Sequence, residues 1–87
     1  MVKITKEMVS NSLQYLNPNK EYHLSLKGKK LMSMENLIIT GNVFECIDLS
    51  NNLIMEIPIL PNLSRLQTII INNNKLSFIE KDFGLHC

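Results

Sequence analysis

The residues best suited to chemistry in this chain of 87 residues are His23, Cys46 and Asp48. An imidazole, a thiol and a carboxylate can form a nucleophilic site when they are brought together, and the same groups can hold a metal ion. The second cysteine, Cys87, is distant, and neither cysteine belongs to a C-x-x-C pair. This spacing argues against a disulfide framework and a structural zinc site, and it favours a reducing, intracellular compartment.

A repeated apolar pattern defines the elements that would carry these residues. The stretch 66–79, LQTIIINNNKLSFI, has the spacing L-x-x-L-x-L-x-x-N-x-L, which is typical of a leucine-rich repeat. The same pattern fills every position in 44–57. It recurs in degenerate form in 21–34, where Glu21 and Lys29 take the first apolar position and the asparagine position. The repeats follow one another at about 22 to 23 residues, within the range of this class.

This pattern predicts an α/β fold: a right-handed leucine-rich-repeat solenoid with a short parallel sheet on its concave side. We expect one domain over residues 1–87. Its expected parts are an N-terminal helical cap, 1–20, and repeats at 21–43, 44–65 and 66–87. Turns or short 3₁₀ segments should form the convex side, because Pro58 and Pro61 disfavour a long regular helix there.

The cap is predicted to contain a helix from Lys6 to Leu16. Thr5 is a suitable N-cap for it, and Val9, Leu13 and Leu16 recur at i, i+4 and i+7. We therefore expect one apolar face of this helix to cover the exposed side of the first repeat.

The repeat register also predicts which side chains share the concave face. Asn52 and Asn74 should point inward, where their amides can satisfy backbone groups of neighbouring turns. Alternate strand residues point to opposite faces. Three outward rows are therefore expected: His23, Cys46 and Thr68; Ser25, Asp48 and Ile70; and Lys27, Ser50 and Asn72, with Gly28, Asn51 and Asn73 beside the last. Such a polar, curved face suits a protein partner better than a small-molecule substrate.

Charge and hydropathy limit the other classes of partner. The nine basic and eight acidic residues nearly cancel, so the basic footprint of a protein that binds nucleic acid alone is absent. The start MVKITKEMVS lacks the apolar core of a signal peptide, and no apolar run approaches the length of a bilayer span. We therefore expect neither membrane association nor RNA binding without a partner.

Residues outside the apolar lattice give a closer resemblance. The chain resembles the A′ family of the U2 small nuclear ribonucleoprotein of the spliceosome, from Met1 to about Glu80. The residues that carry the resemblance are MVKIT at the start, Glu7, Gln14, Tyr15, ENL at 35–37, IDLSNN at 47–52 and INNNKL at 71–76. The resemblance implies a non-catalytic splicing component of the nucleus that uses no cofactor.

The resemblance further implies that the concave face holds the first helix of the RNA-recognition domain of a B″-type protein. The pair would then bind a stem-loop of U2 RNA, mainly through that partner. The partner-binding residues that it implies are Ser25, Lys27, Asp48, Ser50, Asn72 and Asn73. Lys29 and Lys30 could reach RNA phosphate, although a solvated edge loop would have the same composition.

Proteins of the family that this chain resembles are longer solenoids with further repeats. We therefore expect the chain to be a fragment or a truncated product. Its last strand would then be uncovered, and Ile69, Ile71 and Ile79 would line that end of the stack. An isolated chain with such an end is expected to self-associate or to melt without full cooperativity.

Two other hypotheses remain open. The face that carries His23, Cys46 and Asp48 could be catalytic or bind a metal ion, but no oxyanion donors or water-excluding pocket are apparent. Alternatively, the chain could be a generic intracellular leucine-rich-repeat scaffold or regulator, associated with the cytoskeleton or with a phosphatase. Such a protein would share the repeats and bind a different partner.

Overall fold

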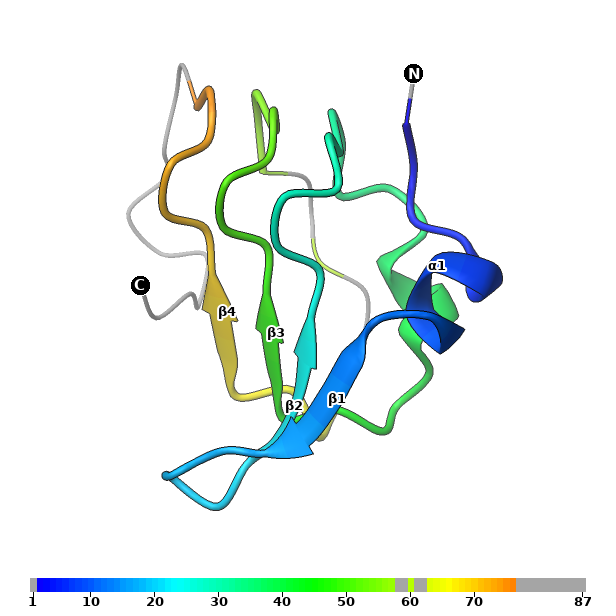
Figure 1. Cartoon of the computed structure of the whole chain (residues 1–87), viewed down its shortest axis with the longest axis vertical. Coiled ribbons are helices and arrows are strands. Elements are labelled where there is room, and N and C mark those ends of the chain that lie inside the picture. Colours follow the sequence, from blue (N-terminus) through cyan, green and yellow to red (C-terminus); the bar gives the residue numbers. More distant parts are fainter. Residues whose placement is uncertain (1, 58–59, 61–62, 77–87) are drawn as a thin grey trace.

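Three short parallel strands lie side by side because each repeat contributes its equivalent segment to the same sheet. The computed structural model describes residues 2–57, 60 and 63–76. Strands β2 (Tyr22–Ser25), β3 (Cys46–Asp48) and β4 (Thr68–Ile70) are neighbours in the sheet, as Figure 1 shows. Leu24 pairs with Ile47, and Ile47 pairs with Ile69. The predicted leucine-rich-repeat solenoid is therefore confirmed, with the register that the repeat spacing gives.

A fourth strand, β1 (Leu13–Leu16), closes the free edge of β2. It runs antiparallel to β2, with Leu13 opposite Ser25 and Tyr15 opposite His23. The predicted helix from Lys6 to Leu16 is therefore wrong in its second half, because helix α1 covers only Lys6–Ser10. Leu13 and Leu16, which were expected to face the core, are each 66% exposed.

Polar side chains explain why α1 ends after so few residues. Thr5 caps its start as predicted, since its hydroxyl accepts a hydrogen bond from the backbone N–H of Met8 at 3.1 Å. At the other end, Ser12 Oγ donates to the carbonyl of Met8 at 2.6 Å, and Gln14 Nε2 donates to the carbonyl of Val9 at 3.0 Å. These bonds replace those of a further helical turn. The chain is then free to pair with β2, whose edge would otherwise expose unpaired main-chain groups.

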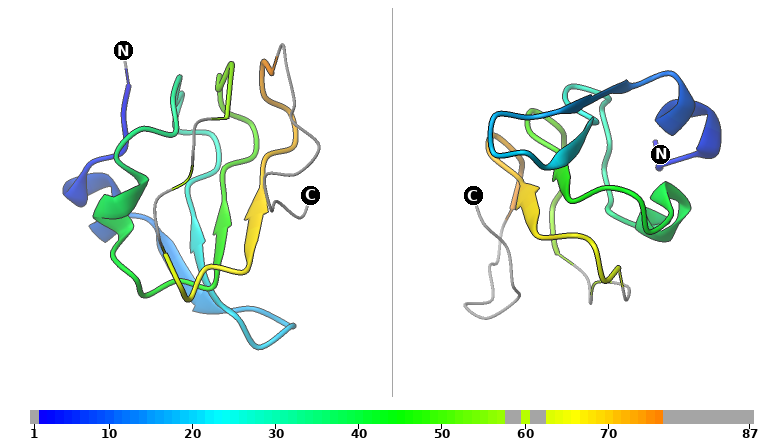
Figure 2. Two further views of the ribbon diagram at one scale, coloured as in Figure 1. Left: turned by 180° about the vertical axis from the view of Figure 1, so that it is seen from behind. Right: turned by 90° about the horizontal axis from the view of Figure 1, so that it is seen from below.

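One apolar core lies behind the strands, between the sheet and the return segments. Its fully buried side chains include Ile4, Leu24, Leu26, Leu31, Ile47, Leu49, Ile54 and Ile69. The return segment of the first repeat contains a 3₁₀ helix, η1 (Leu37–Thr40), which packs against α1, and Figure 2 shows the two together. Within the described residues, no helix has the length and apolar character needed to cross a membrane.

The inward-facing side chains in and after the last described strand are buried rather than open. Ile69 and Ile71 are almost inaccessible to solvent, so the expectation that they line an uncovered end is wrong. Ile79, the third residue of that expectation, lies outside the described residues, as do the two prolines Pro58 and Pro61 of the second return segment.

Each asparagine of the repeat pattern ties its own turn to the preceding repeat. Asn52, which is 3% exposed, accepts hydrogen bonds from the backbone N–H groups of Lys29 and Leu31 and donates to the carbonyl of Leu26. Asn74 accepts from the N–H of Ile54, one repeat earlier. Both amides also bond carbonyl groups within their own repeats. This is the role that the sequence predicts for the two asparagines.

These bonds also explain the lysine at the asparagine position of the first repeat. The asparagine side chains reach backward along the solenoid, and the first repeat has no earlier repeat to hold. The half-buried Lys29 contributes its backbone N–H to Asn52 instead. Lysine at this position therefore removes no hydrogen bond that an asparagine would make to an earlier turn.

Candidate binding face

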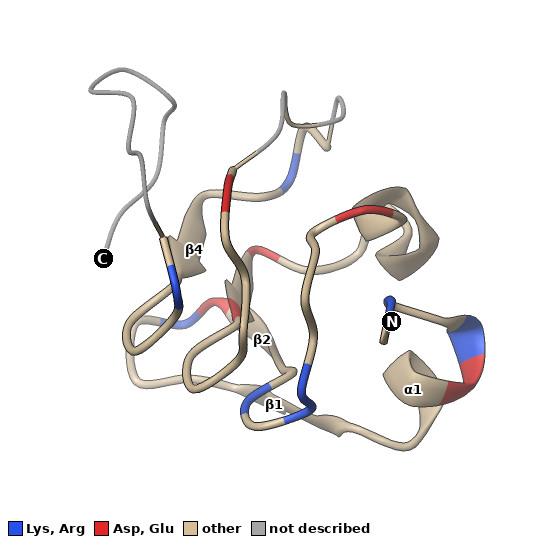
Figure 3. Cartoon of the chain, turned by 90° about the horizontal axis from the view of Figure 1, so that it is seen from above, with Lys and Arg blue, Asp and Glu red and all other residues tan. Residues whose placement is uncertain are grey.

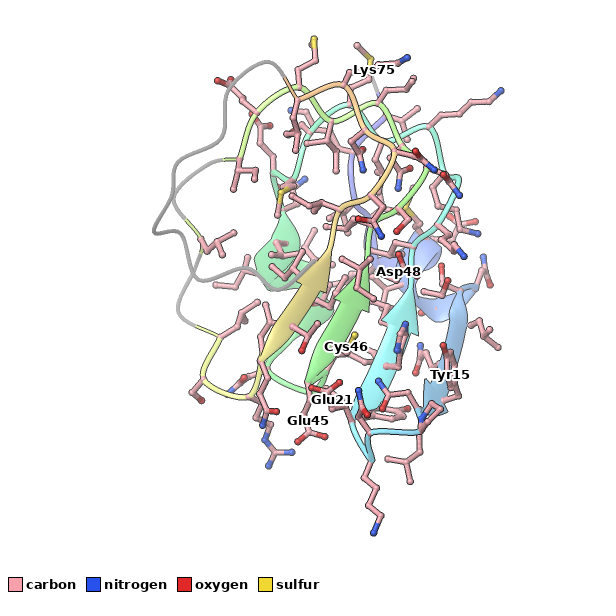
Figure 4. The ribbon with its side chains drawn as sticks, turned by 90° about the vertical axis from the view of Figure 1, so that its left-hand side faces the viewer. Tyr15, Glu21, Glu45, Cys46, Asp48 and Lys75 are labelled. Atoms are coloured by element: carbon pink, nitrogen blue, oxygen red, sulfur yellow. The ribbon has the colours of Figure 1, made fainter. Side chains whose placement is uncertain are left out.

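The strands bring the sequence-predicted residues onto one face of the sheet. The strand register places His23, Cys46 and Thr68 in one row, and it places Asp48 between Ser25 and Ile70 in the next row. Strand β1 lengthens both rows by one residue. Figure 4 looks onto these strands and shows Tyr15, Cys46 and Asp48 along them.

The centre of this face is a carboxylate that is fixed by its own turn. Asp48 is 9% exposed, and its Oδ1 accepts a hydrogen bond from the backbone N–H of Ser50 at 2.9 Å. Ser50 itself is 5% exposed. The only ion pair found among the described residues joins Lys3 to Glu35, so Asp48 has no cationic partner there. Two of the six predicted partner-binding residues therefore present little surface in the isolated chain.

The other predicted residues of the face are more accessible. Ser25 is half-buried, whereas Lys27, Asn72 and Asn73 are exposed. The amide of Asn73 donates to the side-chain carbonyl of Asn51 at 2.9 Å. These four predicted residues can therefore be reached by a partner, and the side chain of one of them is already oriented by a neighbouring repeat.

A left-handed backbone position occurs at the same place in each repeat. Gly28, Asn51 and Asn73 have φ values of 62°, 58° and 55°. Glycine and asparagine tolerate this conformation best. The backbone N–H of Gly28 donates to the carbonyl of Ser50, and that of Asn51 donates to the carbonyl of Asn72. The turns therefore continue the ladder of the strands beyond the sheet.

The two lysines proposed for RNA contact differ in accessibility. Lys30 is exposed, whereas Lys29 is half-buried. Figure 3 shows the basic and acidic positions distributed around the molecule. This distribution agrees with the nearly balanced charge of the whole chain.

A polar network that the sequence pattern did not predict lies on the face where the parallel strands begin. Glu21, which the pattern placed at an apolar position, is half-buried and accepts from the hydroxyl of Thr68 at 3.1 Å. The amide of Asn17 donates to Glu21 at 3.2 Å and to Nδ1 of His23 at 3.1 Å. The ring of Tyr15 stacks on His23, with 4.6 Å between the ring centroids. This network links β1, β2 and β4 across the face.

The geometry argues against a nucleophilic thiol at Cys46. Burial, followed by repulsion from the nearby carboxylates of Glu21 and Asp48, raises the pKa of the Cys46 thiol to about 11. Nδ1 of His23 accepts from Asn17, so this nitrogen is not oriented as a base toward sulfur. A protonated thiol is a poor nucleophile and a poor metal ligand. Within the described part of the chain, no three His, Cys, Asp or Glu residues are placed to hold a metal ion.

Comparison with known proteins gives one consistent result. A leucine-rich repeat family model matches residues 1–86. Probable U2 small nuclear ribonucleoprotein A′ of Drosophila melanogaster is 43% identical over 76 residues, which cover 87% of this chain and 29% of that protein. The U2 small nuclear ribonucleoprotein A′ of Homo sapiens is 40% identical over 89 residues, which cover 100% of this chain and 35% of that protein.

A solved structure agrees with these relatives. A chain in the crystal structure of the D. melanogaster SNF/U2A′ complex superposes with a TM-score of 0.84 at 43% identity, over 94% of this chain and 47% of that chain. The present chain spans about a third of the length of the relatives named above. It belongs to the leucine-rich repeat family, and its relatives within that family are U2 small nuclear ribonucleoprotein A′ proteins.

Proposed function

We propose that this chain is a non-catalytic protein-interaction module of the U2 small nuclear ribonucleoprotein, acting in pre-mRNA splicing in the nucleus. Its concave face binds the RNA-recognition domain of a B″-type protein. The observation that carries this proposal is the match to a chain of the SNF/U2A′ complex, with a TM-score of 0.84 over 94% of the present chain.

The accessible side chains of the face supply the hydrogen bonds and the charge for this contact. Lys27, Asn72 and Asn73 are exposed, and Ser25 is half-buried. Asp48 and Ser50 lie deeper and form the floor between them. A mixed polar face of this kind favours a specific partner over nonspecific apolar association, because each unmatched polar group that is buried weakens a wrong complex.

RNA binding belongs mainly to the partner in this proposal. Lys30 and, in part, Lys29 can add electrostatic attraction to phosphate when the partner holds RNA nearby. The nine basic and eight acidic residues of the chain are too closely balanced to retain RNA alone.

The test is complex formation with purified SNF of D. melanogaster, followed by gel filtration with light scattering. A complex that elutes ahead of both proteins is expected. Asp48→Arg should abolish it, whereas Glu56→Arg, the same change of charge on an exposed return segment, should leave it intact. Because Asp48 is nearly buried, circular dichroism checks the fold, and the exposed Asn72→Arg repeats the test with less risk to the core.

The outcomes separate the partner from the face. If the parent chain forms no complex, the partner assignment fails and a scaffold for another protein is favoured. If the parent binds and both concave variants bind equally well, the partner assignment stands but the concave face is not the interface.

A further inference from the structure

Strand β1 is the end strand of the described sheet, and no described strand pairs with it on its second side. Figure 1 shows it at the opposite end of the sheet from β4. All four of its residues are exposed. An edge strand of this kind presents main-chain N–H and C=O groups to solvent, and such groups can pair with a further strand.

The register of the hairpin shows which main-chain groups of β1 point away from β2. Asn17 donates its N–H to the carbonyl of Glu21 at 2.9 Å, so these two residues form a hydrogen-bonded pair. Hydrogen-bonded and non-hydrogen-bonded pairs alternate along an antiparallel ladder. Leu16 therefore lies opposite Tyr22 in a non-hydrogen-bonded pair, and the same holds two residues earlier for Gln14. The N–H and C=O groups of Gln14 and Leu16, four in all, consequently point outward.

The sequence around β1 lacks the charges that protect many edge strands. Residues 11–19, NSLQYLNPN, contain no charged residue, although 20% of the whole chain is charged. Leu13 and Leu16 are each 66% exposed, and Tyr15 is 38% exposed. Natural edge strands are commonly protected from pairing by lysine or by other charged side chains. Two copies of this edge can therefore approach each other without bringing like charges together.

An antiparallel pair of β1 strands is self-complementary when its two-fold axis passes beside Tyr15. Gln14 then lies opposite Leu16 of the second copy, and these two residues exchange both of their main-chain hydrogen bonds. The symmetric pair does the same, so all four outward groups of each copy are bonded. Tyr15 faces its equivalent in a non-hydrogen-bonded pair, where the side chains are closest. Leu13 becomes a diagonal neighbour of the second tyrosine, within reach of its ring.

We propose that β1 pairs with β1 of a second copy of this chain, so that the two four-stranded sheets join into one continuous sheet. The contact is short, so the dimer is weak and depends on concentration. This inference goes beyond the proposed function and does not depend on it, because the pairing uses the edge of the sheet and needs no SNF.

Sedimentation equilibrium of the isolated chain over a series of concentrations tests the pairing. The mass of the parent should rise from the 10.0 kDa of one chain toward twice that value. Leu16→Pro removes an outward N–H and no bond to β2, and each variant should raise the Kd of the dimer at least about tenfold. The second variant, Leu16→Lys, adds a charge beside its own equivalent across the two-fold axis, and it keeps the test valid if proline disturbs the hairpin.

Ile38→Lys is the matched control for these variants. Ile38 is 64% exposed and lies on η1, away from β1 in the sequence, so its replacement should change the Kd of the dimer by less than about twofold. A parent that keeps the mass of one chain throughout the series would overturn the inference. Leu16→Lys that dimerises as well as the parent would also overturn it, because the contact would then lie on another surface.

A disulfide tests the position of the two-fold axis. In a Cys87→Ser background, Tyr15→Cys places two thiols in a non-hydrogen-bonded pair, whose Cα atoms are about 4.5 Å apart, within the range of disulfides. Cys46 lies two strands from position 15, about 10 Å away, which is too far for a bridge within one chain. In oxidised glutathione, the cross-linked dimer should form at least about tenfold faster than with Ile38→Cys in the same background. Equal rates for the two variants would overturn the proposed pairing.

Discussion

Replacing Asn52 by alanine should destabilise the fold more than any other single change at the asparagine positions. The side chain of Asn52 makes five hydrogen bonds, to Lys29, Leu31, Leu26, Leu49 and Ser50. Alanine removes all of them and leaves the groups within the turn, where water has poor access because Asn52 is 3% exposed.

The magnitude follows from which groups lose their partners. The N–H groups of Lys29 and Leu31 lose an acceptor, and the carbonyl of Leu26 loses its donor. The carbonyl of Leu49 keeps a donor from Asn74, and that of Ser50 keeps one from Gly28. An unsatisfied buried group costs about 1–3 kcal/mol, so the three groups together cost about 3–9 kcal/mol. A chain of 87 residues is expected to have only about 4–13 kcal/mol in total.

Urea denaturation followed by circular dichroism measures this loss. Asn74→Ala is the internal comparison: Asn74 is half-buried and accepts from one backbone N–H, that of Ile54, so we expect about 1–3 kcal/mol. Asn51→Gly is the control, because Asn51 is exposed and glycine adopts its φ of 58° without strain. The expected order of destabilisation is Asn52→Ala, then Asn74→Ala, then Asn51→Gly. If Asn52→Ala shifts the midpoint no more than Asn51→Gly, the backward tie between repeats is not what stabilises the turns.

Four further predictions use the same chain. Lys29→Asn should change stability by less than about 0.5 kcal/mol in urea denaturation, because an asparagine there has no earlier repeat to bond; a large gain would contradict this. Gly28→Asn should be neutral or raise the melting temperature by up to a few degrees, since φ is 62° with no heavy atom within 4 Å of an added Cβ, whereas Gly28→Val should lower it. In a Cys87→Ser background, Cys46 should react with an alkylating reagent at pH 7 more slowly when folded than in urea. The pKa of Cys46 is about 11 in the folded chain and 9.0 in the unfolded chain, so the unfolded chain loses the thiol proton at lower pH. The free energy of unfolding should therefore fall as the pH rises from 9 to 11. A free energy of unfolding that stays constant across this range would refute the raised pKa of Cys46.

The parallel part of the fold could be predicted because the regular spacing of the repeats shows which residues are equivalent. Once Leu24, Ile47 and Ile69 are assigned to equivalent positions, the pairing of three strands and the rows on their outer face follow. The inward asparagines follow from the same lattice. No energetic competition had to be decided to obtain these features.

The segment before the first repeat could not be predicted in this way. Val9, Leu13 and Leu16 have helical spacing, yet the last two lie in a strand and are exposed. The outcome depends on Ser12 and on the free edge of β2, and hydrophobic spacing reports neither of them. The helical spacing of the apolar residues was therefore outweighed by the main-chain hydrogen bonds that pairing with β2 provides.

The sequence predicted where the residues of the candidate binding face lie on the sheet, but it did not predict how deeply they are buried. The register placed Asp48 correctly, whereas its burial depends on the turn at Ser50 and on the side chains beside it. Glu21 falls at an apolar position of the repeat pattern, but its carboxylate accepts a hydrogen bond from Thr68, which is 47 residues away in the sequence. A pattern that compares residues within one repeat cannot predict a hydrogen bond over this distance.

The backward reach of the asparagines has a consequence for how the chain emerges from the ribosome. Synthesis delivers the amino-terminal repeat first. The N–H groups of Lys29 and Leu31, however, remain without their acceptor until Asn52 has been added, and that of Ile54 waits for Asn74. Each turn is therefore completed only when the following repeat has left the exit tunnel. Co-translational folding of such a protein should advance in steps, always one repeat behind the growing end.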